Sequence, residues 1–212
     1  MTLTPESIEP SQVQGYIPQS NIMIDIFKRN INLWQEQFPD NEIENIITND
    51  SLLDIALQIH FGNYYQWIRE EKVRIENQSM EIISKVKKEI DFSNKRRNKL
   101  IGNYDQLCLQ HLNIIERNEF SDYKLNSETP GQMVDRLSIL LLKIFFMGKC
   151  ANSSEFDNEV QCKASENIIA LKTQFNYLLI CYDKSVTNLI RGDAYMCPYK
   201  QIKLYSLDDL KE

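Results

Sequence analysis

Hydrophobic residues recur every three or four positions along most of the chain, the spacing that places them on one face of an α-helix. The first such run predicts a helix over about 21–38, where a proline ends it. A second helix is expected from a cap at Asp50 or Ser51 to about residue 77. A third is expected over about 79–115, with the apolar spacing of a bundle seam.

The clearest helix start in the chain lies at Thr129-Pro130-Gly131-Gln132. Thr129 can cap the helix, Pro130 suits the first helical position, and Gln132 stands where a capping box places Glu or Gln. The helix that follows is apolar almost all round and is expected to end near Gly148.

The last long helix is expected over about 163–191, with Gly192 in a left-handed C-terminal cap. No alternation of strands and helices is visible, so the pattern predicts an all-α protein. We expect a flexible N-terminal arm over 1–20 and one domain over 21–212. That domain is a single helical bundle of about five long helices, with a short extended C-terminal strap over 198–205.

Composition adds limits on function. The 212 residues include 24 Lys and Arg against 30 Asp and Glu, a net charge of -6 that argues against broad binding to nucleic acid or to an anionic membrane and leaves room only for a local basic patch. The basic runs 87–88 and 95–97 are interpreted as solvated faces. The longest apolar stretch, Leu137–Met147, is broken by Lys143 and is too short for a membrane span. Five scattered cysteines and an N-terminus without a secretory leader favour a cytoplasmic protein.

Polar residues interrupt two faces that should be buried. On the second helix, His60, Asn63, Trp67, Glu71 and Arg74 follow one another at intervals of three or four residues. An unpaired buried polar group is unfavourable by about 1 to 3 kcal/mol, so polar residues on such a face need partners or a ligand.

The third and fourth helices show similar interruptions. Asn94 and Arg97 lie in the seam of the third helix with Asp91 on its flank, and Asp135 and Arg136 lie in the apolar fourth helix. Together with the second helix they supply an imidazole, amides, carboxylates and guanidinium groups to one bundle interior. The sequence therefore predicts a polar interior pocket.

The expected roles follow from side-chain chemistry. The acid and base candidates are the groups that can exchange a proton: His60, Glu71, Asp91 and Asp135. The ligand-binding candidates are hydrogen-bonding, aromatic or anion-binding groups: Asn63, Trp67, Arg74, Asn94, Arg97, Thr129, Gly131 and Arg136. The backbone N–H groups that follow Thr129 can hold a phosphate or carboxylate at the helix N-terminus.

A structural interpretation stands beside each of these. The arginines and carboxylates can pair with one another and fix helix register, which we weigh evenly against a ligand site. His60 alone is better explained as a core histidine, and it has no second histidine nearby to form a metal site. Thr129 and Gln132 can satisfy the helix N-terminus themselves.

Acidic residues on the second and third helices suggest a further alternative. Glu70, Glu71, Glu89 and Asp91 resemble in outline the magnesium-binding helices of all-helical nucleotide pyrophosphohydrolases. Their spacing departs from that family's ExxE and ExxD pattern. A metal-dependent nucleotide hydrolase is therefore the third hypothesis, and no metal ligand is assigned.

A long stretch of the chain resembles a known family. SETPG at 127–131, DRLSI at 135–139 and LKI at 142–144 are similar to the SETPGxxxDRLSIxxLKI signature of an uncharacterised bacterial domain family of unknown function. The helix over 60–74 resembles its HxxNxxxW…ED…R segment, and 90–98 resembles its IDxxNxxRND segment. Residues 199–205 resemble a YRQFKMYN strap, whereas Lys99 and Ser206 depart from the pattern.

The resemblance implies a sugar-related role, because members of that family are often encoded near glycosyltransferases for cell-surface polysaccharide. The leading hypothesis is a helical bundle that binds, and can process, a small phosphorylated or sugar-bearing ligand in surface-glycan assembly; no cofactor is indicated. The alternative is a non-catalytic interaction protein that forms a homo-oligomer or docks on a glycosyltransferase. A translocated bacterial effector is a further alternative.

Overall fold

The computed structural model describes residues 17–37, 51–75, 78–112 and 124–198. This part of the chain forms five helices and two very short strands, which confirms the all-α prediction. The elements are α1 (Ser20–Gln37), α2 (Leu52–Arg74), α3 (Met80–His111), β1 (Lys124–Leu125), α4 (Pro130–Asn152), α5 (Asn158–Arg191) and β2 (Ala194–Tyr195).

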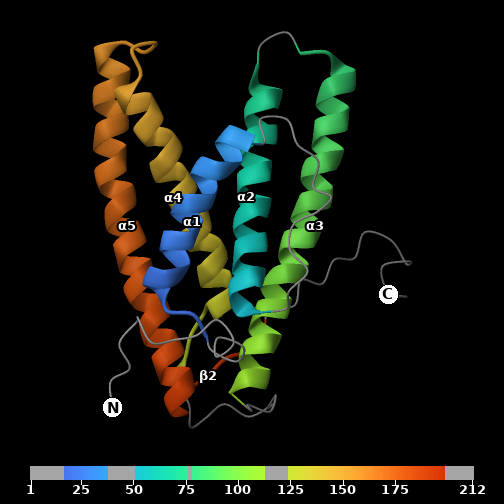
Figure 1. The fold of residues 1–212 in the computed structure, drawn as a ribbon, viewed down its shortest axis with the longest axis vertical. Coiled ribbons are helices and arrows are strands. Elements are labelled where there is room, and N and C mark those ends of the chain that lie inside the picture. The colour runs from blue at the N-terminus through green and yellow to red at the C-terminus, as the bar shows by residue number, and fades with distance from the viewer. Residues whose placement is uncertain (1–16, 38–50, 76–77, 113–123, 199–212) are drawn as a thin grey trace.

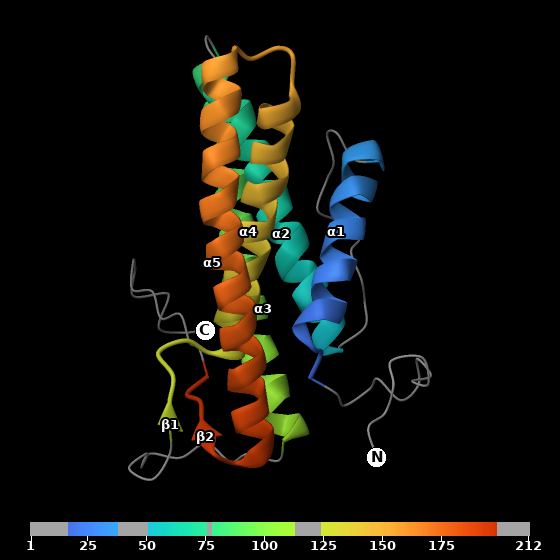
Figure 2. The ribbon, with the colours of Figure 1, turned by 90° about the vertical axis from the view of Figure 1, so that its left-hand side faces the viewer.

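The helices are arranged as two hairpins, α2–α3 and α4–α5, with α1 laid against one side of them (Figure 1). Within each hairpin the two helices are in extensive contact, and α2 also packs on α4. Figure 2 shows α1 on one side of this assembly and the β1–β2 pair at the end opposite the two hairpin turns. Toward those turns the hairpins diverge (Figure 1).

Helix ends follow local chemistry. The Ser51 side chain caps α2 by accepting a hydrogen bond from the Asp54 backbone N–H. Thr129 and Gln132 form the predicted capping box at the start of α4. Gly192 ends α5 with φ of 73°, in the left-handed region that glycine enters without steric penalty. These three predictions are confirmed.

Two helices are longer than the apolar pattern suggested. α5 begins at Asn158 rather than near residue 163, because the Asp157 side chain accepts from the Val160 backbone N–H and caps it. α4 continues past Gly148 to Asn152. The extra turns bring the ends of the α4–α5 hairpin close together.

The core lies where all five helices meet. Its largest fully buried side chains include Phe27, Ile59, Tyr104, Leu137 and Tyr182. The Tyr104 and Tyr182 hydroxyls lie 2.8 Å apart, and the Tyr182 hydroxyl donates to the Pro18 carbonyl. A buried hydroxyl needs such a partner, and this pair links α3 and α5 to the segment before α1.

The boundary of the expected arm changes. Ile17 is buried in the core, and the Ser20 hydroxyl donates to Asp183 at 2.6 Å, so the last residues assigned to the arm are anchored to the bundle. Residues 1–16 and the expected strap over 199–205 lie outside the described residues. β1 pairs with β2 in parallel, Lys124 opposite Ala194, a contact that the pattern did not indicate. None of the helices in the described ranges has the length and apolar character needed to cross a membrane.

Candidate functional site

A buried polar network joins α2, α3 and α4, with Asn63 at its centre. The Asn63 Nδ2 atom donates to Asp135 Oδ1 at 2.8 Å and to Ser138 Oγ at 3.0 Å. Arg97 Nη1 donates to Asn63 Oδ1 at 2.7 Å and to Gln66 Oε1 at 3.3 Å. One amide on α2 therefore connects a guanidinium on α3 with a carboxylate and a hydroxyl on α4.

The network continues through His60 to α1. His60 Nε2 lies 3.3 Å from the Phe27 carbonyl, which can only accept, so this nitrogen carries the proton. His60 Nδ1 then accepts from the Ser138 hydroxyl, 2.7 Å away. The imidazole also stacks on the Phe27 ring, with centroids 4.1 Å apart. Four helices are joined by one directional chain of hydrogen bonds.

Burial sets the protonation of this network. Burial lowers the pKa of His60 from 6.5 to about 3, with the Phe27 carbonyl acting weakly in the opposite direction. The imidazole is therefore neutral near pH 7. It cannot act as an acid there, although its Nε2–H still donates the hydrogen bond to Phe27. Burial raises the pKa of Asp135, while the Arg97 charge and the Asn63 hydrogen bond lower it.

The interior around Arg97 holds no ligand-sized space. Arg97 Nε lies 3.6 Å from Asp135 Oδ1 as an ion pair and is a buried atom without a hydrogen-bond partner in the described structure. Beside it is a cavity of about 10 Å³, lined in part by Gly62 and Ser93. That volume holds no more than about one water molecule. The geometry therefore favours the structural interpretation of this network, and a ligand pocket in this interior stays a prediction.

Several predicted site residues lie elsewhere. Glu71 and Arg74 are exposed and pair with each other at 2.9 Å, and Asp91 is exposed on α3. Asn94 is half-buried, and Trp67 stacks on Phe146 with centroids 4.9 Å apart. The expectation that Glu71, Arg74 and Asp91 share one interior with His60 is wrong, whereas Trp67 packs against the edge of the core. Toward the hairpin turns α2 diverges from α4 (Figure 1), so the end of α2 that carries Glu71 and Arg74 lies outside the core.

The N-terminus of α4 is already satisfied by the protein. The Gly131 backbone N–H donates to the buried Asp105 carboxylate at 2.8 Å, and the Gln132 N–H donates to Thr129 Oγ1. A Cβ on Gly131 would lie 2.7 Å from the Ile101 carbonyl oxygen. Gly131 therefore allows the close approach of α3 to α4, Thr129 caps α4, and these N–H groups already have partners within the protein.

A groove of about 860 Å³ runs between α4 and α5, bordered by the segment that precedes α4. Its charged lining is Arg136, Lys143 and Lys184, with one carboxylate, Glu128. Uncharged hydrogen-bonding side chains add to it: Asn126, Thr173, Gln174, Ser185 and Asn188. Met133 and Leu178, both buried, supply apolar surface. The volume of this groove lies within the range that is typical of small-molecule sites.

Arg136 is the most favourable anion-binding group in the groove. Its Nη1 donates to both Glu128 oxygens, at 2.5 and 2.6 Å. Its Nε and Nη2 have no partner among the described residues, and these two nitrogens form the fork that binds a phosphate in bidentate fashion. Lys143 follows seven residues later on α4, which places the two cations about 10 Å apart along the helix.

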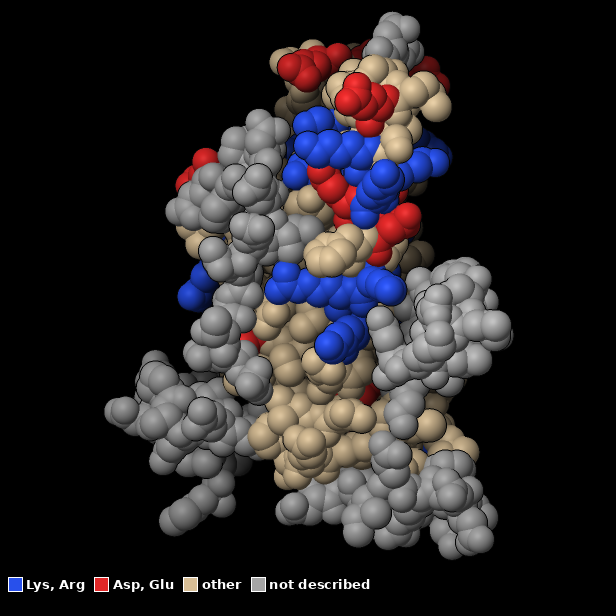
Figure 3. All heavy atoms as spheres, turned by 90° about the vertical axis from the view of Figure 1, so that its right-hand side faces the viewer, with Lys and Arg blue, Asp and Glu red and all other residues tan. Residues whose placement is uncertain are grey.

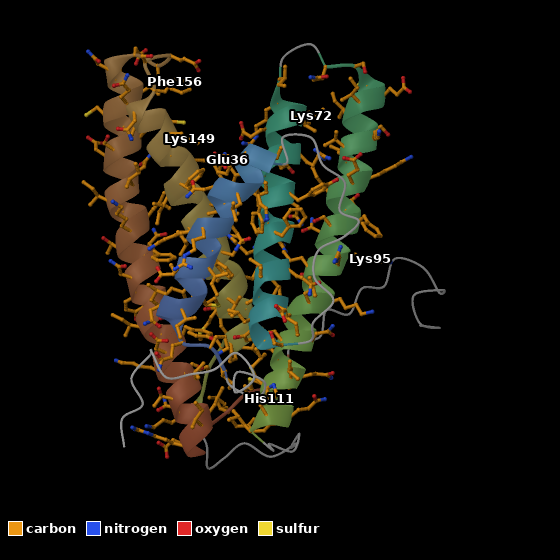
Figure 4. The ribbon with its side chains drawn as sticks, in the orientation of Figure 1. Glu36, Lys72, Lys95, His111, Lys149 and Phe156 are labelled. Carbon is orange, nitrogen blue, oxygen red and sulfur yellow. The ribbon has the colours of Figure 1, made fainter. Side chains whose placement is uncertain are left out.

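Sequence reasoning missed most of this groove. Arg136 was expected in the interior, yet its side chain is 54% exposed on the groove side of α4. A signal was present, because Lys143 lies two helical turns beyond Arg136 in an otherwise apolar segment. No pattern indicated Lys184, which comes from a different helix. Among the described residues, no cluster of three or more His, Cys, Asp or Glu side chains forms a metal site. His111, the other histidine of the chain, lies in the last turn of α3 (Figure 4).

Comparison with known proteins places the chain in a family. Residues 53–197 match the family described as "Protein of unknown function (DUF4254)", and the chain belongs to that family. The match covers α2 to α5 and so includes both the network and the groove. Neither a curated protein nor a solved structure has detectable similarity to the chain.

Proposed function

We propose that this protein binds a small phosphorylated or sugar-bearing ligand in the α4–α5 groove and acts in the bacterial cytoplasm in surface-glycan assembly. The observation that carries the proposal is the grouping of Arg136, Lys143 and Lys184 around one groove of about 860 Å³. The location and the glycan role rest on the sequence resemblance and the scattered cysteines.

Charge supports an anionic ligand. Three cations and one carboxylate line the groove, whereas the whole chain carries a net charge of -6. Cations grouped on one concave surface attract anions to that surface. Two phosphates, or a phosphate and a carboxylate, match cations that are about 10 Å apart on α4.

The uncharged lining supports a carbohydrate component. Asn126, Gln174 and Asn188 offer amide groups that both donate and accept, as sugar hydroxyls require. Tyr177, 71% exposed, borders the groove and presents a ring face on which a sugar or base can pack. Phosphate and hydroxyl recognition are thus combined in one groove.

The proposal is for binding rather than for proton transfer. His60 is neutral and buried behind α1, and Asp135 is held by Asn63 and Arg97. Neither residue lines the groove. The acid and base candidates therefore support the fold in this proposal, and the groove supplies recognition.

A thermal-shift titration tests the proposal with named probes: uridine diphosphate glucose, glucose 1-phosphate, inorganic pyrophosphate and glucose. A ligand at 100 times its dissociation constant stabilises the native state by about 2.7 kcal/mol. We expect a shift with a phosphorylated probe that is lost in Arg136→Gln and kept in Lys172→Gln. Lys172 is an exposed α5 lysine outside the groove, so its variant matches the charge change. Equal loss in both variants contradicts the groove as the site.

One observation favours the interaction protein as a second candidate. Ile169, Tyr177 and Ile180 are large side chains exposed on α5, and all three are more than half exposed. Their helical spacing places them on one side of α5, where a homo-oligomer or a glycosyltransferase partner can bury them. Light scattering tests the homo-oligomer. A dimer that Ile180→Asp dissociates supports it, and a monomeric wild type contradicts it.

A further inference from the structure

The outer face of α3 carries a row of lysines around one aromatic ring. Lys85, Lys88, Lys95 and Lys99 are exposed, and Phe92 among them is 63% exposed. Their spacing of three, four or seven residues places them on one helical face. We call these five residues the α3 basic stripe. Figure 3 shows two groups of basic side chains on this face, with acidic side chains between them.

Most lysines of the stripe lie one helical turn from the exposed carboxylates of Glu81 and Asp91 without forming ion pairs with them. None of the ion pairs within the described ranges includes one of these lysines. The nearby carboxylate of Glu89 is held by Arg69 at 2.8 Å and also accepts from Tyr65. Lys95 points away from the bundle (Figure 4).

We propose that the α3 basic stripe docks the protein, with α3 lying flat, on an anionic lipid surface. The stripe spans 15 residues of α3, or about 21 Å, so its charges can contact several lipid head groups at once. Clusters of four to eight Lys or Arg on a helix face are typical of sites for acidic phospholipids. Phe92 at the centre inserts its ring between head groups.

The residue types favour lipid over nucleic acid. Nucleic-acid grooves use arginine for bidentate phosphate contacts and several aromatic rings for base stacking. The stripe has lysines, which act as point charges, and a single ring. Arg96, at its edge, donates to Gln58. Docking by this face is independent of the α4–α5 groove, because none of its residues lines that groove.

Docking through lysines is reversible and sensitive to salt. Each lysine near an anionic surface strengthens binding about fivefold. The contribution of Phe92 does not depend on ionic strength, since it comes from apolar burial.

Co-sedimentation with vesicles tests the proposal. The full chain is mixed with vesicles of phosphatidylglycerol and phosphatidylcholine, or with phosphatidylcholine alone. We expect binding to the anionic vesicles only, about 25-fold weaker in Lys88→Gln/Lys95→Gln. The matched control, Lys163→Gln/Lys172→Gln, removes the same charge from exposed positions on α5 and should retain binding within about threefold. Phe92→Ala should lower binding by a similar factor at low and at high salt.

Three results overturn the proposal. One is absence of wild-type binding to anionic vesicles, and the second is equal weakening by the two double variants. The third is binding to a DNA or RNA oligonucleotide, measured by fluorescence anisotropy, that depends on Lys88 and Lys95 while vesicle binding does not. Circular dichroism of each variant confirms that the helices are retained.

Discussion

Two polar regions lie on different sides of α4 and differ in burial, charge and the space that they enclose. The interior network around Asn63 is dry, closely bonded and joined to four helices, with space for about one water. The α4–α5 groove is open, positively charged and large enough for a ligand. Asp135 belongs to the first and Arg136 to the second, because adjacent residues on a helix point about 100° apart.

The comparison shows that polar residues in one short motif can serve two separate purposes. Substitutions in the network should change the free energy of unfolding, whereas substitutions in the groove should change binding. The predictions below separate these two effects, starting with the largest change in stability.

Replacing Asn63 with Leu should have the largest effect. The variant leaves Asp135, Ser138 and Arg97 without their shared partner, and each unsatisfied group destabilises by about 1 to 3 kcal/mol. We expect a loss of about 4 kcal/mol in the free energy of unfolding, measured by urea denaturation. Asn176→Leu, at an exposed α5 position, should change it by less than about 0.5 kcal/mol. Similar values for the two variants would show that the network is not structural.

The second prediction compares two glycines of α4. In Gly131→Ala the new Cβ would lie 2.7 Å from the Ile101 carbonyl oxygen and 2.8 Å from Asp105 Oδ1, so the helices must move apart. We expect a loss of about 3 kcal/mol by the same measurement. Gly148→Ala meets nothing within 4 Å in the described structure and should stabilise by about 0.5 kcal/mol. A neutral Gly131→Ala would contradict the close approach of α3 and α4.

Stability should depend on pH through His60. The pKa of His60 is about 3 when folded and 6.5 when unfolded, so the unfolded chain binds the extra proton as pH falls below 6.5. The contribution of the neutral, buried His60 to the free energy of unfolding is complete above pH 6.5 and is lost progressively toward about pH 3. Wild type should be about 2 kcal/mol less stable at about pH 5 than at about pH 7 because of this group.

His60→Gln provides the control for this pH effect. The variant should lack that part of the decrease, while the raised pKa of Asp135 acts in the opposite direction in both proteins. Urea denaturation at a series of pH values measures the difference. Parallel pH profiles for the two proteins would mean that His60 is solvated or charged in the fold.

A substitution in the groove should have the smallest effect on the free energy of unfolding. Arg136→Gln breaks only a partly exposed ion pair with Glu128. Pairs of this kind contribute about 1 kcal/mol or less, so the free energy of unfolding should change by under about 1 kcal/mol. A larger loss by urea denaturation would place Arg136 in the structural network, against the division described above.

The sequence predicted the parts of this fold that depend on neighbours along the chain. Ser51, Thr129 and Gly192 end or begin helices through contacts within a few residues, and the amphipathic pattern identified all five helices. The polar residues on buried faces also marked where helices meet, since His60, Asn63, Arg97 and Asp135 do come together.

Features that depend on how helices are oriented could not be predicted. The periodicity of α2 continues through Glu71 and Arg74, but α4 has diverged from that end of the helix, so the same stripe becomes exposed. The Asp105 contact with the Gly131 N–H and the pairing of β1 with β2 join segments far apart in the chain. The groove needs Lys184 from α5 beside Arg136, and no local pattern relates these two residues.

The central claim is that the ligand binds in the α4–α5 groove and not in the network, and two adjacent residues test it most directly. Isothermal titration calorimetry compares Arg136→Gln with Asp135→Asn, using the phosphorylated probe that shifts the wild-type melting temperature. The account predicts that Arg136→Gln weakens binding at least about tenfold, the value of one charge-assisted hydrogen bond, while Asp135→Asn binds as wild type does. Normal affinity in Arg136→Gln together with lost binding in a folded Asp135→Asn would contradict it.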